Sequence, residues 1–310
     1  MQILDRKEIE NALSIERVFR LIEEGFIAYS QKKTVIPPVA AMQFENPPGD
    51  CHIKYGYLKE GSYFVVKIAT GFPLNTKSGL PAGNGMIVLF SKKTGAPLVL
   101  FNDEGFLTDM RTAIAGAIAA KTLVPSHVEC IGCVGTGAQA YYQLSLLPHV
   151  TRCRKVLIWG RDGEKARRLA KDPRLGHFSI QVAPTLDSLA ASCNLIVTTT
   201  SSKAPLLFAH HIKPGTHITA VGADDIGKQE LDPSLFRKAD LVVCDSIAQC
   251  LSFGDTSHAV RSAAIKKEDL MELGALLANP LLGRKNDTQI TICDLTGIAA
   301  QDLQIAIAAM

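Results

Sequence analysis

The hydrophobic pattern of the chain changes character roughly one third of the way along it. Near the start, apolar residues recur at helical spacing on one face, at Ile15, Val18, Phe19, Ile22 and Phe26. Ser14 is a suitable N-cap for this helix, which we expect to run to about Lys32, and Asp5 can cap a shorter helix before it. The Pro-rich stretch 34–50 predicts an extended connection.

Strand patterns follow this helix. Residues 51–58 and 63–70 form one predicted strand pair, and residues 86–91 and 97–102 form a second pair with a hairpin turn at 92–95. A helix followed by antiparallel strands is not a nucleotide-binding pattern. We therefore expect an α+β domain that binds substrate or forms a dimer.

An alanine-rich helix at 107–124 begins the second part of the chain, in which strand-like and helix-like segments alternate. The strand-like runs are 128–134, 155–159, 178–182, 194–199, 217–221, 241–245 and 289–293. This alternation predicts parallel strands with crossover helices, a Rossmann-type doubly wound α/β sheet. A last helix at 297–310 can fold back on the first domain. We therefore assign 1–110 with 297–310 to one domain and 111–296 to the other.

The segment VECIGCVGTGAQAYYQLSLL, residues 128–147, contains an apolar strand, a glycine turn and a helix. In dinucleotide-binding folds such a turn uses its first Gly for the bend, its second for approach to the pyrophosphate, and a third small residue for packing. A helix starting at Ala138 would direct its amides at the phosphates. A turn that binds nothing is the alternative, but the flanking elements favour a cofactor site. Its predicted contacts are Gly135, Thr136, Gly137, Ala138 and Gln139.

The end of the second strand bears on the choice of dinucleotide. An acidic residue there suits the ribose of NAD, whereas an arginine suits the phosphate of NADP. Arg161 occupies this position, so NADP(H) is favoured, and the adjacent Asp162 keeps NAD(H) possible. The basic residues at 165, 167 and 168 are interpreted as a solvated helix face. Further predicted cofactor contacts, at later strand ends, are Thr199, Val221 and Gly222.

Composition excludes several classes of function. The 310 residues carry a net charge of +3 without a basic stripe, so we expect no nucleic acid partner. No apolar run is long enough for a bilayer, and the start lacks a signal-peptide core, so a cytoplasmic protein without a membrane partner is expected. The eight cysteines lie mostly in apolar runs and read as reduced thiols, Cys130 and Cys133 included. The histidines show no metal spacing, and we predict no metal.

Three polar positions stand out from their surroundings. Lys67 interrupts an apolar strand, where it is either an edge-strand charge or a buried functional ammonium. Arg111 lies at the start of the alanine-rich helix and could hold a carboxylate with two hydrogen bonds. Asp224 and Asp225 follow a strand at the edge where such folds bind ligands. For any one of these taken singly, the interpretation as a surface salt-bridge partner is favoured.

Short motifs in a fixed order resemble the ornithine cyclodeaminase and mu-crystallin family over nearly the whole chain. They are KIATGFP (67–73), GLP (79–81), LTDMRT (107–112), VGTGAQA (134–140), AVGAD (220–224), GKQEL (227–231) and DLTG (294–297). The resemblance implies a homodimer, a nicotinamide cofactor and an amino or imino acid substrate. It further implies that Lys67 and Arg111 bind the substrate carboxylate, and that Asp224 serves as acid or base. Fixing the carboxylate would orient the Cα hydrogen for hydride transfer, and a nearby carboxylate could move the accompanying proton.

One departure from the family concerns an arginine that the cyclodeaminases carry in the first extended segment. Residues 35–40 read VIPPVA and contain none. His52 and Lys54 share a strand face and could replace its charge, or they could lie on an exposed face. If Lys54 points inward, the chain could accept a dicarboxylic imine such as iminosuccinate.

Three activities fit these residues. We favour an NAD(P)-dependent oxidoreductase that reduces an imine or ketimine of a 2-oxo acid to an amino acid, or runs the reverse. The alternatives are an NAD+-dependent ornithine cyclodeaminase and a non-catalytic NADP-binding protein. Asp224 argues against the last, while Arg161 and the missing arginine argue against the cyclodeaminase.

Overall fold

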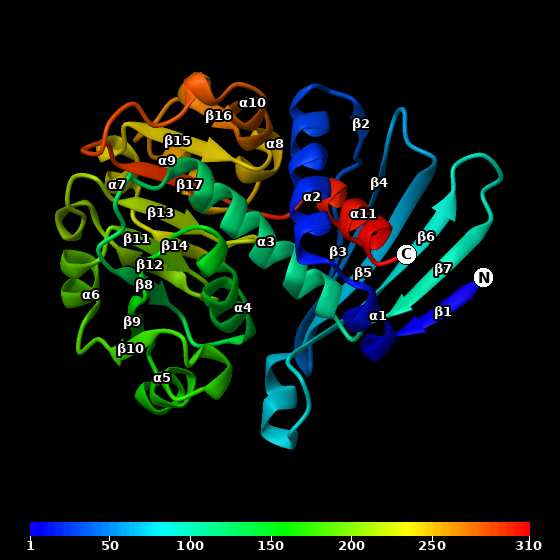
Figure 1. Cartoon of the computed structure of the whole chain (residues 1–310), viewed down its shortest axis with the longest axis horizontal. Coiled ribbons are helices and arrows are strands. Elements are labelled where there is room, and N and C mark those ends of the chain that lie inside the picture. Colours follow the sequence, from blue (N-terminus) through cyan, green and yellow to red (C-terminus); the bar gives the residue numbers. More distant parts are fainter. The chain divides into compact units, whose positions relative to one another are not determined.

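The computed structural model describes all residues, 1–310, and the chain divides into two compact units (Figure 1). Unit 1 comprises Met1–Arg111 and Ile298–Met310, and unit 2 comprises Thr112–Gly297. Helix α3 (Phe106–Leu123) contains the first junction, since Arg111 is the last residue of the first part of unit 1. No helix of the chain is both long enough and apolar enough to traverse a lipid bilayer.

Unit 1 is a seven-stranded sheet with helices against one face. The strand order is β1-β7-β6-β5-β4-β2, and β3 pairs with β4. The strands are β1 (Gln2–Asp5), β2 (Thr34–Val35), β3 (Ala40–Glu45), β4 (Pro48–Leu58), β5 (Tyr63–Gly71), β6 (Gly83–Ser91) and β7 (Pro97–Asn102). The helices are α1 (Arg6–Ala12), α2 (Ile15–Ser30) and α11 (Ala299–Ala308). Helix α11 packs on α2, β4 and β5, so the last helix belongs to unit 1.

Local sequence explains how unit 1 begins. Asp5 accepts the Glu8 amide at 2.9 Å while Glu8 accepts the Asp5 amide at 2.8 Å, which is a capping box for α1. Ser14 caps α2 through the Arg17 amide, and the predicted apolar stripe of α2 is buried at Val18, Ile22 and Phe26 and half-buried at its other two positions. The extended connection predicted for 34–50 was wrong, because β2 and β3 both pair with β4 there. Pro37, Pro38 and Pro47 lie in the connections between these short strands, and Pro48 is the first residue of β4, where a missing amide is tolerated.

Unit 2 contains an eight-stranded sheet in which every pair is parallel, with the order β10-β9-β8-β11-β13-β17-β15-β16. Its strands are β8 (Ile131–Val134), β9 (Lys155–Trp159), β10 (Ser179–Val182), β11 (Leu195–Thr198), β13 (His217–Ala220), β15 (Leu241–Cys244), β16 (Leu270–Glu272) and β17 (Thr291–Asp294). Two short strands, β12 (Lys203–Leu207) and β14 (Gln229–Leu231), form a separate parallel pair. The central strands are buried throughout, as expected for a sheet covered on both faces.

Helices connect most of these strands. They are α4 (Ala138–Leu146), α5 (Gly163–Ala170), α6 (Leu186–Ser192), α7 (Pro233–Lys238), α8 (Ile247–Cys250), α9 (Asp255–Arg261) and α10 (Leu273–Ala278). The first strand, β8, lies between β9 and β11, so the chain switches direction across the sheet at this point. Ligands of open α/β sheets bind beyond the carboxyl ends of the strands at such a switch point. The predicted Rossmann-type fold class is confirmed, and it brings the glycine turn after β8 to this position.

Candidate functional site

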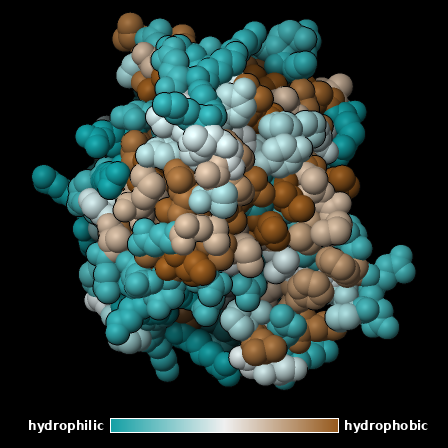
Figure 2. Space-filling view, turned by 90° about the vertical axis from the view of Figure 1, so that its right-hand side faces the viewer, coloured by the Kyte–Doolittle hydropathy of each residue, from teal (hydrophilic) through white to brown (hydrophobic).

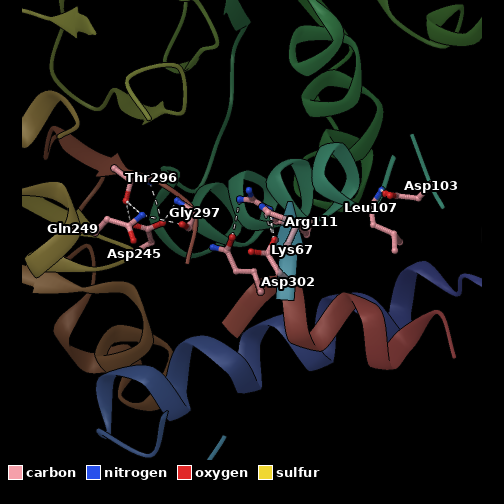
Figure 3. Close-up of polar contacts among 10 residues, drawn as sticks. Lys67, Asp103, Leu107, Arg111, Asp245, Gln249, Thr296, Gly297 and Asp302 are labelled. Carbon is pink, nitrogen blue, oxygen red and sulfur yellow. Dashed lines mark hydrogen bonds and ion pairs between the residues drawn. The ribbon is translucent and has the colours of Figure 1, made fainter. Parts of the chain in front are cut away.

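Unit 1 buries a cluster of charges around Lys67 on β5 (Figure 3). Lys67 is 1% exposed, and its strand lies between β4 and β6, so the buried ammonium interpretation holds and the edge-strand interpretation is wrong. Lys54 is its direct partner across β4 and is 7% exposed. Like charges directly opposite each other on neighbouring strands repel, so this pair requires a counter-charge.

Helix α11 supplies that counter-charge through Asp302, which is fully buried. Lys67 Nζ donates to Asp302 Oδ1 at 2.9 Å, and Arg111 Nε lies 3.0 Å from the same oxygen. The neighbouring residue of α11, Gln301, accepts a hydrogen bond from Arg111 Nη1 at 3.0 Å. Two consecutive side chains of one helix therefore contact the guanidinium, and one of them also contacts the ammonium.

The charges of the cluster perturb one another. Burial, followed by the charge of Arg111, lowers the pKa of Lys67 to about 7, although Asp302 acts in the opposite direction. Burial by itself would raise the pKa of Asp302, but Lys67, Arg111 and Lys54 together hold it below its ordinary value. Unit 1 thus keeps a carboxylate ionised in its core and leaves Lys67 able to change charge near neutral pH.

His52 lies two residues before Lys54 on β4, opposite Ala69, and is half-buried. The structure excludes the exposed-face interpretation for Lys54 and places both side chains on the face that carries Lys67. Asp103, which follows β7, is buried as well and accepts the Leu107 amide at 2.6 Å. Burial raises the pKa of Asp103 despite these amide contacts.

The predicted dinucleotide turn of unit 2 has the backbone geometry that its sequence requires. Gly135 has φ of 131°, and a Cβ there would overlap the Thr199 hydroxyl, so no other residue fits. Gly137 is the N-cap of α4 without any side-chain cap, and no atom lies within 4 Å of where its Cβ would be. The amides of α4 are therefore available to an anion, which is what a pyrophosphate needs. These residues fit a dinucleotide.

A cavity of about 420 Å³ adjoins this turn. Thr136, Gly137 and Ala138 line it from one side, and Lys165 and Arg168 of α5 line it from another. All three basic residues of α5 are exposed, as the solvated-face interpretation expects, and Arg167 also pairs with Glu164 at 2.6 Å. Asp162 caps α5, because its Oδ1 accepts the amides of Glu164 and Lys165. The Gln139 side chain is oriented toward Gln143, whose amide lies 3.5 Å away.

Glu230, which the sequence did not predict as a functional residue, links the ends of the central strands β11 and β13 through hydrogen bonds. Its carboxylate accepts the Thr198 hydroxyl at 2.6 Å, the Thr200 amide at 2.5 Å and the Gly222 amide at 2.8 Å. The predicted contacts Thr199, Val221 and Gly222 lie in the two segments that it joins. A charged residue inside the buried strand β14 was the available signal for this role.

Asp224 lies two residues after Gly222, on an exposed loop of unit 2. It forms an ion pair with Lys228 at 2.6 Å, and about half of its side chain is exposed. Its proposed acid or base role concerns a group that solvent reaches, unlike the buried carboxylates around it.

Comparison with known proteins identifies the family. The sequence model of the ornithine cyclodeaminase/mu-crystallin family matches residues 1–309. The chain belongs to this family. It is 33% identical over 306 residues to an iminosuccinate reductase of Paracoccus denitrificans, covering 99% of this chain and 94% of the relative.

Two solved structures share the whole fold. An archaeal alanine dehydrogenase dimer with bound NAD has a TM-score of 0.91 at 33% identity and covers 100% of this chain and 94% of its own. A pyrroline-2-carboxylate reductase of Thermococcus litoralis, with NADH and L-proline, has a TM-score of 0.93 at 29% identity, with coverages of 100% and 96%. These relatives are oxidoreductases of imines and amino acids, which confirms the predicted family and its reaction class.

Proposed function

We propose that this protein reduces the imine of a 2-oxo acid to the amino acid with a nicotinamide cofactor, or catalyses the reverse reaction. The observation that carries the proposal is the buried Lys67–Arg111 pair of unit 1, whose two cations converge on one carboxylate oxygen. A site built this way can bind the carboxylate of an amino or imino acid. The relatives, which act on such molecules, support the same reaction.

The chain's own residues have distinct tasks in this reaction. The glycine turn after β8 and the start of α4 would hold the reduced nicotinamide cofactor, which would provide a hydride for the imine carbon. Lys67 and Arg111 hold the substrate carboxylate, which fixes the orientation of the carbon that reacts. Asp224 supplies the proton that the imine nitrogen gains, because it is the exposed carboxylate of its loop and can exchange protons with solvent. Glu230 holds the ends of β11 and β13, from which the predicted cofactor contacts arise.

The direct test is the loss of NADPH or NADH absorbance when purified protein is mixed with pyrroline-2-carboxylate or with an acyclic 2-oxo acid and ammonia. Oxidation that depends on the imine supports the proposal. Ammonia release from ornithine with NAD+, without net reduction, would instead establish the cyclodeaminase activity. Cofactor binding without turnover of any of these substrates would favour a binding protein.

Lys54 favours a substrate with a second carboxylate. It replaces in charge the arginine that the first extended segment lacks, it is buried, and it faces Lys67 across the strand pair. A second substrate carboxylate would be attracted to this additional cation. We therefore expect faster reduction with oxaloacetate and ammonia, which form iminosuccinate, than with pyruvate and ammonia. Lys54→Met is expected to reduce the first rate more than the second, and equal losses would contradict this assignment.

NADP(H) is the proposed cofactor. Arg161 follows β9, and Lys165 and Arg168 line the cavity beside the glycine turn, so three cations are available for a 2′-phosphate. Asp162, the residue that could bind the ribose of NAD, is already engaged as a helix cap. Arg161→Ala and Arg168→Ala are each expected to weaken NADP+ binding about tenfold and NAD+ binding little. Arg167→Ala, on the same helix but paired with Glu164, is the matched control.

A homodimer is proposed from the open face of the unit 1 sheet. Tyr55 and Met86 are exposed there, Phe64 and Phe90 stack at 4.6 Å, and a hollow of about 670 Å³ lies over Tyr55, Tyr57 and Phe64. Figure 2 shows apolar residues gathered on the face of the molecule that carries β6 and β7. Large exposed apolar patches usually mark interfaces. Light scattering should give twice the monomer mass, and Tyr55→Glu should shift it toward the monomer.

The remaining expectations about partners form part of the same proposal. A small amino or imino acid is the substrate, and no nucleic acid or membrane partner is proposed. A cytoplasmic location is also proposed, which localisation of a tagged protein would test.

A further inference from the structure

Asp302 is an unusual residue for its position. It is the only charged residue of α11, a helix whose other members are apolar or small apart from two glutamines, and it is fully buried. One of its oxygens, Oδ1, receives both Lys67 and Arg111, whereas Oδ2 has no hydrogen-bond partner. A buried ion pair of this kind adds little to stability compared with well-packed apolar residues. Its geometry therefore calls for a role other than holding the fold together.

We propose that Asp302 is a positioning residue for the reaction, which orients Lys67 and Arg111 as one carboxylate-binding pair and keeps the Lys67 ammonium charged. This role rests on the proposed function, because it concerns the pair that binds the substrate carboxylate. Asp302 is not itself proposed to contact substrate. It acts through the two cations that it holds.

The orienting part of this role follows from the contacts. Lys67 has a flexible side chain, and its Nζ is fixed by the 2.9 Å hydrogen bond to Asp302. Arg111 is held at two points of different kind: its Nη1 donates a hydrogen bond to Gln301, and its Nε forms an ion pair with Asp302 that is not aligned as a hydrogen bond. Two contacts on a planar guanidinium define the plane of the group. The bidentate geometry that Arg111 offers to a ligand is thus set by α11.

The charging part follows from the groups that surround Lys67. They are Lys54 on β4, Arg111 on α3, Asp302 on α11, and Asp103 after β7. Burial and then the two cations favour the neutral amine, and Asp302 opposes them both by its charge and by its hydrogen bond. Burial also raises the pKa of Asp103, which makes this carboxyl a poorer counter-charge. Without the charge of Asp302, Lys67 would therefore lose its proton at a lower pH.

The test measures carboxylate affinity against pH in the protein loaded with NADP+. Pyrrole-2-carboxylate, a planar and unreactive carboxylate, is titrated by calorimetry into wild type and Asp302→Asn. Wild-type affinity should fall as the pH rises through about 7, where Lys67 loses its charge. In Asp302→Asn this fall should begin at least about one pH unit lower, which makes binding at least about fivefold weaker at pH 7. Affinity should recover when the pH is lowered.

Three further variants separate positioning from a structural role. Glu24→Gln removes a negative charge from an exposed position of α2 and should leave the profile unchanged. Asp302→Glu retains the charge, so its carboxylate affinity should begin to fall at the same pH as in wild type. Lys54→Met combined with Asp302→Asn removes one repelling cation together with the anion, so this double variant should fold. The pH at which its carboxylate affinity begins to fall should move back toward neutral. Dinucleotide affinity should be the same in all of them, because that site lies in unit 2.

The outcomes distinguish this inference from the proposed function. The positioning role alone would be overturned if the affinity of Asp302→Asn begins to fall at the same pH as that of wild type, or if its affinity is reduced equally at every pH. If wild type binds no carboxylate ligand at all, the carboxylate site fails, and the proposed function and the role of Asp302 are overturned together.

Discussion

The two units of this chain bury carboxylates in opposite ways. In unit 1, Asp302 is surrounded by cations that hold its pKa below the ordinary value. In unit 2, Glu230, Asp255 and Asp294 take their hydrogen bonds from amides and hydroxyls, and burial raises the pKa of each. Asp294 reaches a pKa of about 7.

The buried carboxylate of unit 1 belongs to a cluster of charges, whereas the buried carboxyl groups of unit 2 hold backbone segments together. In the proposed function the cations of unit 1 serve a substrate carboxylate, and Asp302 balances their charge within the core. Unit 2 uses carboxyl groups as acceptors that fasten backbone: Asp255 Oδ1 accepts the amides of Glu230 and Leu231, and Glu230 in turn fastens the strand ends. A carboxyl group of this kind can be protonated and still accept hydrogen bonds from backbone amides. Substitutions that alter charge should therefore have different consequences in the two units.

The largest effect is expected for Lys67→Met, which removes the ammonium and keeps most of the volume. Loss of one of two carboxylate-binding cations should lower kcat/KM by about a thousandfold, because the substrate is no longer held for hydride transfer. Dinucleotide affinity, measured by nicotinamide fluorescence, should remain within about twofold of wild type, since the glycine turn is unchanged. Activity near the wild-type level would remove Lys67 from the site, and loss of cofactor binding would show that the charge cluster supports unit 2 instead.

An intermediate effect is expected for Glu230→Gln. The clamp receives three hydrogen-bond donors, and the amide NH2 of glutamine would face at least one of them. The loosened strand ends should weaken cofactor binding by about tenfold, which corresponds to one mismatched buried hydrogen bond. Isothermal titration with NADP+ measures this change. Glu268→Gln, at an exposed position of unit 2, is the control and should bind like wild type. Equal affinities for both variants would show that the strand ends need no clamp.

The smallest effect is expected for Asp294→Asn, and it concerns stability. The folded protein holds a proton on Asp294 up to about pH 7, whereas the unfolded chain releases it near the ordinary value of 3.8. Wild type therefore loses stability as the pH rises through this window, and asparagine removes that dependence. The melting temperature of the variant relative to wild type should rise by a few degrees between about pH 5 and pH 8. A constant difference across this range would mean that Asp294 is ionised in the fold.

Local sequence determined the elements and the cofactor turn. Asp5 and Ser14 began the first two helices because a cap needs only the amides of the next turn. The glycines at 135 and 137 identified the dinucleotide turn, because the backbone at Gly135 excludes a side chain and Gly137 leaves the start of α4 open to a ligand. Lys67 and Arg111 also stood out, since a charge within an apolar stretch is visible without knowing its partner.

Only the tertiary structure decided how those charges are compensated. Asp302 is 235 residues from Lys67 in the sequence, and Glu230 is 32 residues from Thr198, so neither pairing follows from periodicity or spacing. Whether Lys54 faces inward was also undecided until the pairing of β4 with β5 placed it opposite Lys67. The physical reason is the same in each case. A buried charge is tolerated only beside a specific partner, and packing between distant segments, rather than local preference, chooses that partner.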